Sequence, residues 1–325
     1  MCTRVLWNTN QVAVVVGRSM DWPESTEPKI VVFPNGIDRD GGKVDQVVVV
    51  KENPLIWKSK YGSVVVTAYG VGTVDGINEK GLGVNLLYLT SADYGKRDAS
   101  KGGVQSTLWG QYFLDNAATV EEALELMDGI QPVMAEYAGH RSSVHLSLED
   151  ASGDSAIIEY VGGELRIYHG KQYMVMTNDP TYDLQLENMN QFDFSQATRD
   201  TPLPGNVDPV SRFVRSSYFL QALREPKSLR EAIAGVLSIA RNASVPLNAP
   251  YKTAGTIYDT EYRTVLDLTN RRYFFELTTS PNVIWLELDT FNLSEGAPVL
   301  SIDPDNMDLS GDISSQFVRE KSLKF

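Results

Sequence analysis

Side chains that bind metals or form disulfides are scarce in this chain of 325 residues, which contains one cysteine and three histidines. A single cysteine excludes an intrachain disulfide, so cysteine pairing says nothing about the redox compartment. His140, His145 and His169 are scattered, and neither a C-x-x-C nor an H-E-x-x-H motif is present. A zinc site is therefore not expected, and we predict that the protein binds no metal.

Glycine-rich loops that cradle phosphates are also lacking. The sequence has no G-x-x-x-x-G-K-[ST] motif, and no glycine-rich turn joins a predicted strand to a helix. Phosphoryl transfer and hydride transfer both lose support, and no cofactor is expected.

Long apolar runs and excess positive charge are the remaining absences. No apolar run approaches the ~18–20 residues that a membrane span needs. Residues 1–16 lack the basic start and long apolar core of a signal peptide. The sequence as given therefore favours a cytoplasmic protein, or a periplasmic one if a leader was removed. The net charge of −13, from 29 basic and 42 acidic side chains, disfavours nucleic acid and anionic membranes as partners.

The order of predicted elements indicates the fold class. Turn residues separate β-rich runs, and no break in composition marks a linker, so we predict one domain over residues 1–325. Strands are expected at 3–9, 11–16, 29–33, 46–51, 63–68, 83–89, 144–148, 156–160, 165–168, 173–177, 263–268, 273–277 and 284–288, and helices at 105–117, 119–127, 211–224 and 228–240. Residues 181–210 are polar and are expected to form a covering loop. Strands, a helix pair, strands, a helix pair and strands again predict an α+β fold with two antiparallel sheets and helices outside.

Cys2 is the residue whose position in the chain most clearly suggests a chemical role. It follows Met1, and a small second residue permits removal of that methionine. Cys2 would then carry a thiol and a free α-amine, and an amine that titrates near pH ~7.7–8.0 is a suitable base for the thiol. The alternative is that Cys2 only packs in the core, because a lone cysteine is usually a small buried hydrophobic residue.

The segment after the first predicted turn supplies charged neighbours for Cys2. Asn8-Thr9-Asn10 separates two β-rich runs and predicts a hairpin, which would hold the N-terminus rigidly in a sheet. Arg18 and Asp21 are expected at or just past the end of its second strand. Alone, they could form a surface ion pair worth ~0–1 kcal/mol.

Several segments resemble one known family. They are Cys2, Arg18-Ser19-Met20-Asp21-Trp22, Asn78-Glu79-Lys80-Gly81-Leu82, His145-Leu146-Ser147-Leu148, residues 153–160, Met176-Thr177-Asn178, Arg212-Phe213-Val214-Arg215, residues 241–246 and Arg263-Thr264-Val265. In this order and over most of the chain, they resemble the choloylglycine hydrolases, which include bile salt hydrolases and penicillin V acylases. The resemblance implies a four-layer αββα N-terminal-nucleophile hydrolase fold that acts on linear amides.

The resemblance also implies roles for the residues around Cys2. Cys2 would attack the amide carbonyl, and its α-amine would take the thiol proton and later give a proton to the leaving nitrogen. Asp21 would orient that amine. Arg18 would stand near the sulfur and favour the thiolate, as an adjacent cation does.

Three later positions complete the implied site. Asn178 would donate its side-chain amide to the tetrahedral oxyanion, and the backbone N–H of Tyr88 would be the second donor. Arg212 matches the last polar residue of the family's site, with Arg215 one turn later as its rival. Taken alone, Asn178 could be a turn residue before Asp179-Pro180, and Arg212 could be a solvated charge.

Substrate preference is read from two aromatic residues and one short connection. Trp22 follows Asp21, and Tyr88 lies where bile salt hydrolases carry asparagine, which favours flat or apolar acyl groups. For Trp22, core packing is the alternative. The connection from Asn178 to Arg212 is short, as in the Gram-negative branch of penicillin V acylases. The family resemblance also implies a homotetramer, although this short connection would lack an intersubunit arm.

Three functions are therefore weighed. The preferred one is an acylase that cleaves penicillin V or long-chain N-acyl-homoserine lactones, and so a quorum-quenching enzyme, through a thioester on Cys2. A bile salt hydrolase is the second. A non-catalytic ligand-binding protein of the same fold is the third, and it predicts an uncleaved Met1, which would block the proposed base.

Overall fold

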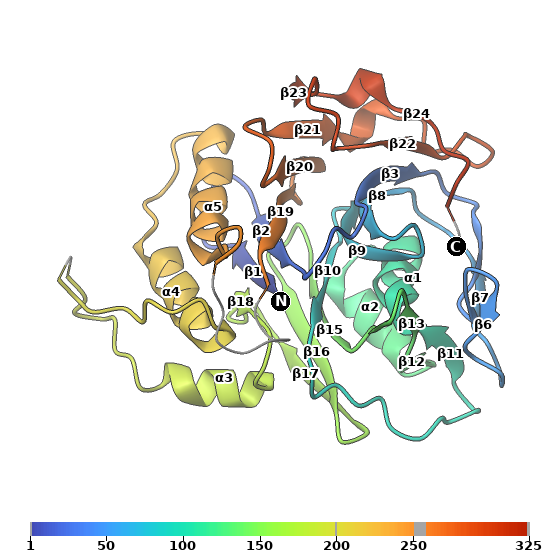
Figure 1. Cartoon of the computed structure of the whole chain (residues 1–325), viewed down its shortest axis with the longest axis horizontal. Coiled ribbons are helices and arrows are strands. Elements are labelled where there is room, and N and C mark those ends of the chain that lie inside the picture. The colour runs from blue at the N-terminus through green and yellow to red at the C-terminus, as the bar shows by residue number, and fades with distance from the viewer. Residues whose placement is uncertain (1, 199, 250–257, 324–325) are drawn as a thin grey trace.

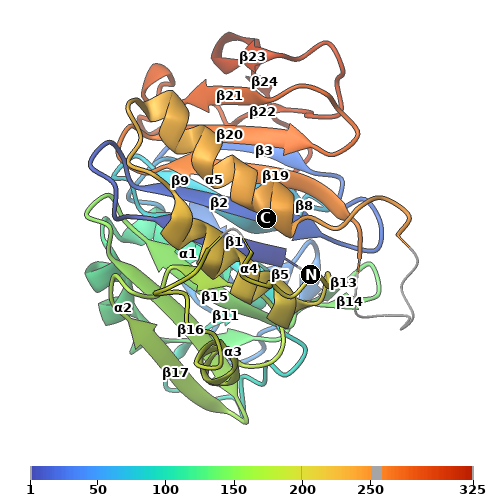
Figure 2. The ribbon, with the colours of Figure 1, turned by 90° about the vertical axis from the view of Figure 1, so that its left-hand side faces the viewer.

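Two large β-sheets lie face to face between two layers of helices in the computed structural model (Figures 1 and 2). The structure describes residues 2–198, 200–249 and 258–323. Helices α4 (Pro209–Ala222) and α5 (Leu229–Ala243) cover one sheet, and α1 (Trp109–Asn116) and α2 (Val120–Met127) cover the other. This arrangement confirms the predicted α+β class and its four αββα layers.

The sheet that carries Cys2, called the first sheet, has seven strands in the order β18-β1-β2-β19-β20-β21-β23. Its strands are β1 (Cys2–Trp7), β2 (Val15–Asp21), β18 (Val175–Met176), β19 (Thr260–Asp267), β20 (Arg272–Leu277), β21 (Ile284–Glu287) and β23 (Gly311–Asp312). Neighbours pair antiparallel except β21 with β23 at the edge, which pair parallel.

The second sheet has nine strands in the order β17-β16-β15-β10-β9-β8-β3-β22-β24. They are β3 (Lys29–Phe33), β8 (Ser63–Ala68), β9 (Gly72–Asn78), β10 (Gly83–Tyr88), β15 (Val144–Glu149), β16 (Ser155–Val161), β17 (Glu164–His169), β22 (Leu300–Ile302) and β24 (Val318–Arg319). Two-stranded ribbons flank it: β4 (Asp38–Asp40) with β7 (Ile56–Lys58), β5 (Lys43–Val44) with β6 (Val47–Val48), β11 (Gly102–Gln105) with β12 (Ile130–Val133), and β13 (Glu136–Tyr137) with β14 (His140–Arg141).

Three of the described helices, α2, α4 and α5, begin at residues whose side chains cap them. The described helices are α1 (Trp109–Asn116), α2 (Val120–Met127), α3 (Tyr182–Met189), α4 (Pro209–Ala222) and α5 (Leu229–Ala243), with short 3-10 turns at Ser106–Leu108, Leu288–Thr290 and Ser314–Gln316. Thr119 and Ser228 accept hydrogen bonds from the backbone of the first turns of α2 and α5, as capping-box residues do. None of these helices is both long and apolar enough to cross a membrane.

Both faces of β1 and β2 are covered, so every residue in them is buried. One face lies against α5, because a Cβ on Gly17 would come within 2.4 Å of Val236. Alternation along the strand then places Ser19 and Asp21 on this helix-facing side. Arg18 and Met20 face the second sheet, together with Cys2, which pairs with Met20.

The predicted bounds of the second strand are wrong. It was expected over residues 11–16, but β2 runs from Val15 to Asp21. The side-chain oxygen of Asn10 accepts hydrogen bonds from the N–H groups of Val12 and Ala13 and so holds this segment in a turn. Arg18 and Asp21 therefore lie inside the strand rather than at or past its end.

Three further predictions need correction. The covering loop expected over 181–210 begins with helix α3. Strand β9 was missed, because Gly72, Asp75 and Gly76 are typical of turns rather than strands. Strand β22, near the end of the chain, was missed as well, and it pairs with β3 in the second sheet.

Candidate active site

Cys2 begins β1 and is only 2% exposed. Its Sγ faces the second sheet, 3.7 Å from the sulfur of Met20 and 3.3 Å from Nη2 of Arg18. Its backbone N–H donates to Oδ1 of Asn178 over 2.6 Å. The sulfur and the backbone nitrogen thus have separate polar neighbours.

Arg18 is held beside the sulfur by a buried carboxylate that sequence analysis missed. Its Nη1 lies 3.0 Å from Oδ2 of Asp75 and donates to the carbonyl of Val74. Burial alone lowers the pKa of Arg18, but the negative charges of Cys2 and Asp75 outweigh it and raise that pKa. The guanidinium is therefore a fixed positive charge next to the sulfur.

Asp75 is itself confined by hydrogen bonds. Burial raises the pKa of its carboxyl, against the lowering effects of Arg18, Tyr273 and Thr264. The hydroxyls of Tyr273 and Thr264 donate to its two oxygens. These contacts leave Asp75 little freedom to move and so fix Arg18.

Asp21 lies on the opposite, helix-facing side of β2. It is fully buried and accepts a hydrogen bond of 2.6 Å from the hydroxyl of Thr260. Its Oδ2 lies 3.7 Å from Nη1 of Arg212. The surface ion pair weighed for Arg18 and Asp21 is wrong, because both are buried and each faces another charged partner.

Arg212 reaches the start of β1 from the first turn of α4. Pro209 at the beginning of that helix and the Asp208 side chain, which accepts from Ser211 N–H, set where the helix begins. Nη1 of Arg212 donates a hydrogen bond of 2.6 Å to the carbonyl of Cys2 and a second one to the Thr3 hydroxyl.

The same guanidinium also contacts Asn178, with Nη2 donating 3.0 Å to its Oδ1. Burial lowers the pKa of Arg212, although Asp21 and Cys2 act in the opposite direction. Arg215, the rival considered from the sequence, instead contacts the carbonyls of Pro204 and Asn206.

Asn178 and Tyr88 meet beside Cys2. Nδ2 of Asn178 donates 2.6 Å to the carbonyl of Tyr88, the last residue of β10. The N–H of Leu89 donates to the carbonyl of Ser143. Because hydrogen-bonded and non-hydrogen-bonded pairs alternate along antiparallel strands, Tyr88 and Val144 form a non-hydrogen-bonded pair. The N–H of Tyr88 therefore points away from β15, to the same side as its carbonyl and Asn178.

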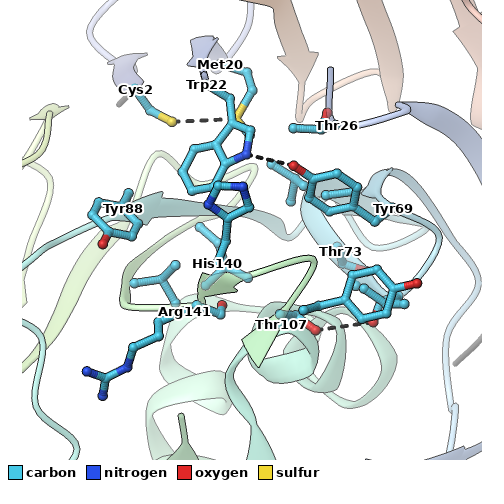
Figure 3. Close-up of a pocket in the computed structure, with 18 of the residues that line it drawn as sticks. Cys2, Met20, Trp22, Thr26, Tyr69, Thr73, Tyr88, Thr107, His140 and Arg141 are labelled. Carbon is cyan, nitrogen blue, oxygen red and sulfur yellow. Dashed lines mark hydrogen bonds between the residues drawn. The ribbon is translucent and has the colours of Figure 1, made fainter. Parts of the chain in front are cut away.

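An open, mostly apolar pocket leads to Cys2 (Figure 3). Trp22 stands over its centre, with its ring 5.7 Å from that of Tyr88 and 5.1 Å from that of His140, both edge to face. The two predicted substrate-binding aromatics thus line the same pocket, which Arg18 and Arg141 also line.

One wall of the pocket is a chain of hydrogen bonds that sequence analysis missed. Trp22 Nε1 donates 2.9 Å to the Tyr69 hydroxyl, which donates 3.0 Å to Glu24. His140 Nε2 lies 2.9 Å from the same Glu24 oxygen. The hydrogen bonds from His140 and Tyr69 lower the pKa of Glu24. Only the closeness of Glu24 to Trp22 in the sequence hinted at this wall.

The structure therefore brings together Cys2, Arg18, Asp21, Tyr88, Asn178 and Arg212, with Trp22 at the pocket. Met1, whose removal we expect, lies outside the described residues. Positive charge beside a thiol, amide donors nearby and an apolar pocket are what acyl transfer from an amide requires.

Two stacked sheets between helix layers, with a cysteine at the start of the first strand, define the N-terminal-nucleophile hydrolase fold. A family model described as linear amide C–N hydrolases, choloylglycine hydrolase family, matches residues 2–312. The chain belongs to this family of hydrolases.

Individual relatives agree with the family. Penicillin V acylase of Pectobacterium atrosepticum is 35% identical over 100% of this chain and 92% of its own length. The solved structure of penicillin V acylase from Agrobacterium tumefaciens has a TM-score of 0.89 and 37% identity, covering 100% of this chain and 99% of that one. A bile salt hydrolase/transferase of Clostridium perfringens is 26% identical over 69% of this chain and 73% of its own.

Proposed function

We propose that this hydrolase is an acylase that releases a flat or apolar acyl group from penicillin V, from long-chain N-acyl-homoserine lactones, or from both. The observation that carries the proposal is the apolar pocket that runs from Trp22 and Tyr88 to the sulfur of Cys2. A phenoxyacetyl or alkyl chain would bury apolar area there and meet aromatic faces. The similarity to two penicillin V acylases supports the same substrate class.

In the proposed mechanism, removal of Met1 frees the α-amine of Cys2, which accepts the thiol proton. The sulfur attacks the amide carbonyl beside the charge of Arg18, which lies 3.3 Å away. Asp21 orients the amine, and Arg212 orders the charged and polar groups around it. The buried contacts of Arg212 with Cys2 and Asn178 support its role.

The tetrahedral oxyanion would be bound by the Asn178 side-chain N–H and the Tyr88 backbone N–H. The register of β10, which turns the Tyr88 N–H toward Asn178, supports this pairing. When the C–N bond breaks, the protonated amine of Cys2 gives its proton to the leaving nitrogen. Water then attacks the thioester, which releases the carboxylic acid and restores the thiol.

Hydrolysis of penicillin V, decanoyl-homoserine lactone and glycocholate should be compared under one set of conditions. We expect kcat/KM for one of the first two to exceed that for glycocholate at least tenfold. Dominant turnover of glycocholate would overturn the proposed specificity. A Cys2→Ala variant that kept full activity would overturn the mechanism, and an intact mass that retains Met1 would favour the non-catalytic ligand-binding alternative.

A further inference from the structure

Asn178 lies beyond the strand ladder that fixes its neighbours. The β1–β18 ladder pairs Val5 with Val175 and Arg4 with Met176. Continuing that register would place Asn178 opposite Cys2, and there its side chain, rather than its backbone, bonds to the Cys2 N–H. Additional contacts must therefore orient the peptide between Thr177 and Asn178.

A buried histidine supplies one of these contacts. His145 on β15 is 1% exposed, and its Nε2 lies 2.8 Å from the carbonyl oxygen of Thr177. Its Nδ1 lies 2.8 Å from Oε1 of the fully buried Glu159 on β16. The second Glu159 oxygen accepts from the N–H of Tyr182, which begins α3.

The partners determine how many protons this pair holds. A carbonyl can only accept, so Nε2 of His145 must carry a proton. The contact between Nδ1 and Glu159 needs a second proton, on the imidazole or on the carboxyl, because two lone pairs would otherwise face each other. In either form, the pair is neutral overall and directs one N–H at the Thr177 carbonyl.

We propose that His145 and Glu159 are positioning residues that orient Asn178 toward Cys2. The Thr177 carbonyl belongs to the peptide plane that ends in the Asn178 nitrogen, so fixing it fixes the direction in which the Asn178 side chain leaves the backbone. Gln185 of α3 holds the other side of the segment through the Thr177 hydroxyl and the Asn178 carbonyl. The proposal rests on the oxyanion role proposed for Asn178.

The test is a double-mutant cycle on kcat with the substrate that the panel selects. Loss of an oxyanion donor lowers the rate ~10²–10³-fold, so Asn178→Ala should do so. His145→Leu should lower kcat about 10- to 100-fold with little change in KM, because it misplaces a donor without touching the pocket. In the Asn178→Ala background, the same substitution should lower kcat less than threefold, since the group it positions is gone.

Two substitutions of Glu159 distinguish the effect of its hydrogen bonds from the effect of its charge. Glu159→Gln can still donate to His145 and accept from Tyr182, so it should keep kcat within about threefold of the parent. Glu159→Leu should resemble His145→Leu. The matched control is His169→Leu. His169 also pairs with a carboxylate, Asp154, but its side chain is 43% exposed, so this substitution should leave kcat unchanged.

Each outcome has a defined meaning. Equal losses from His145→Leu with and without Asn178, a change in KM alone, or no change would overturn the proposal. Full activity of Asn178→Ala would instead overturn the oxyanion role on which it rests. If His145→Leu does not fold, as judged by thermal unfolding, the Glu159→Gln and Glu159→Leu variants carry the test in both backgrounds.

Discussion

Arg212 connects the residues that the proposed mechanism needs in one place. Its guanidinium contacts the Cys2 carbonyl, the Asn178 side chain and the Asp21 carboxylate, and it is fully buried. A planar group with several N–H donors can reach all of them at once, whereas an ammonium on a flexible stem cannot.

We therefore expect Arg212→Lys to lower kcat by about 10²-fold, because Cys2 and Asn178 lose a common support. Steady-state kinetics with the preferred substrate measures the effect. Arg215→Lys is the matched control, since Arg215 lies one turn further along α4 and contacts Pro204 and Asn206. It should keep kcat within about threefold, and the reverse ranking would contradict the assignment to Arg212.

Residues with a local or motif signal could be predicted from the sequence, and those without one could not. Cys2 was identifiable by its position, and Arg18, Asn178 and Arg212 by their resemblance to family segments. Asp75 gave no such signal, and His145, although it begins one of the resembling segments, was given no role. Their partners are far away in the sequence, and only the packing of the two sheets brings Asp75 against Arg18.

At the scale of elements, the β13–β14 ribbon contributes to the lining of the pocket, as His140 and Arg141 show (Figure 3). It carries His140, whose ring stacks on Tyr69 with 6.5 Å between centroids and 10° between planes. Burial raises the pKa of Tyr69 to about 12, so its hydroxyl stays protonated at neutral pH and links Trp22 to Glu24.

Tyr69→Phe removes this link and keeps the ring. We expect KM to rise about fivefold with kcat within twofold, because one hydrogen bond worth ~1 kcal/mol no longer fixes Trp22 over the acyl group. Tyr61→Phe, outside the pocket, serves as the control. A fall in kcat at unchanged KM would contradict a role limited to binding the acyl group.

A second element-scale feature attaches the end of the chain to the second sheet. The Ser301 hydroxyl of β22 donates 2.6 Å to Glu320, and Ser322 donates to it as well. Burial alone raises the pKa of Glu320, but these hydrogen bonds outweigh it and lower the pKa to about 2.

A lowered folded-state pKa means that Glu320 stabilises the fold above its unfolded pKa of about 4.3 and loses this contribution as the pH falls toward 2. Glu320→Gln should thus lower the free energy of unfolding by about 1–2 kcal/mol at pH 7. The difference from the parent should shrink between about pH 4 and pH 2, as urea unfolding would show. Glu295→Gln, at an exposed pair with Lys58, should have no measurable effect, and a difference that did not depend on pH would contradict the proposed cause.

Element prediction succeeded where a local signal existed and failed where tertiary contacts decided. Strands β3 and β8 and the start of α2 follow from β-branched runs and a capping box, and their positions were predicted correctly. Strand β9 contains Gly72 and Gly76, and its extended form depends on pairing with β8 and β10 on either side. Such pairing leaves no mark in the strand's own composition.

At the scale of the whole molecule, buried charged groups occupy the space between the two apolar sheets. Arg4 of β1 lies 2.6 Å from Glu149 of β15, and Arg18 of β2 lies 3.0 Å from Asp75 of β9, with all four side chains at most 1% exposed. Each pair connects a strand near Cys2 to the second sheet. Burial raises the pKa of Glu149, as it does for Asp75.

These two pairs allow the structural and chemical uses of buried charge to be separated. Removing one member should cost about 3–5 kcal/mol, because its partner is left as an unpaired buried charge. Replacing both members with apolar side chains should recover most of that loss, since neither charge is then desolvated. Urea unfolding of Arg4→Met, Glu149→Leu and the double variant measures this for the first pair, and we expect the double variant to keep kcat within about threefold.

The matched variants at the second pair should recover stability in the same way but not activity. Arg18→Leu/Asp75→Leu removes the positive charge that lies 3.3 Å from the Cys2 sulfur, so kcat should fall at least 10²-fold in a protein that is still folded. If both double variants were active, the charge at Arg18 would serve only to hold the sheets together. If both were inactive and folded, the position of β1 itself would depend on the Arg4–Glu149 pair, and the two sheets would need their buried charges for alignment rather than for chemistry.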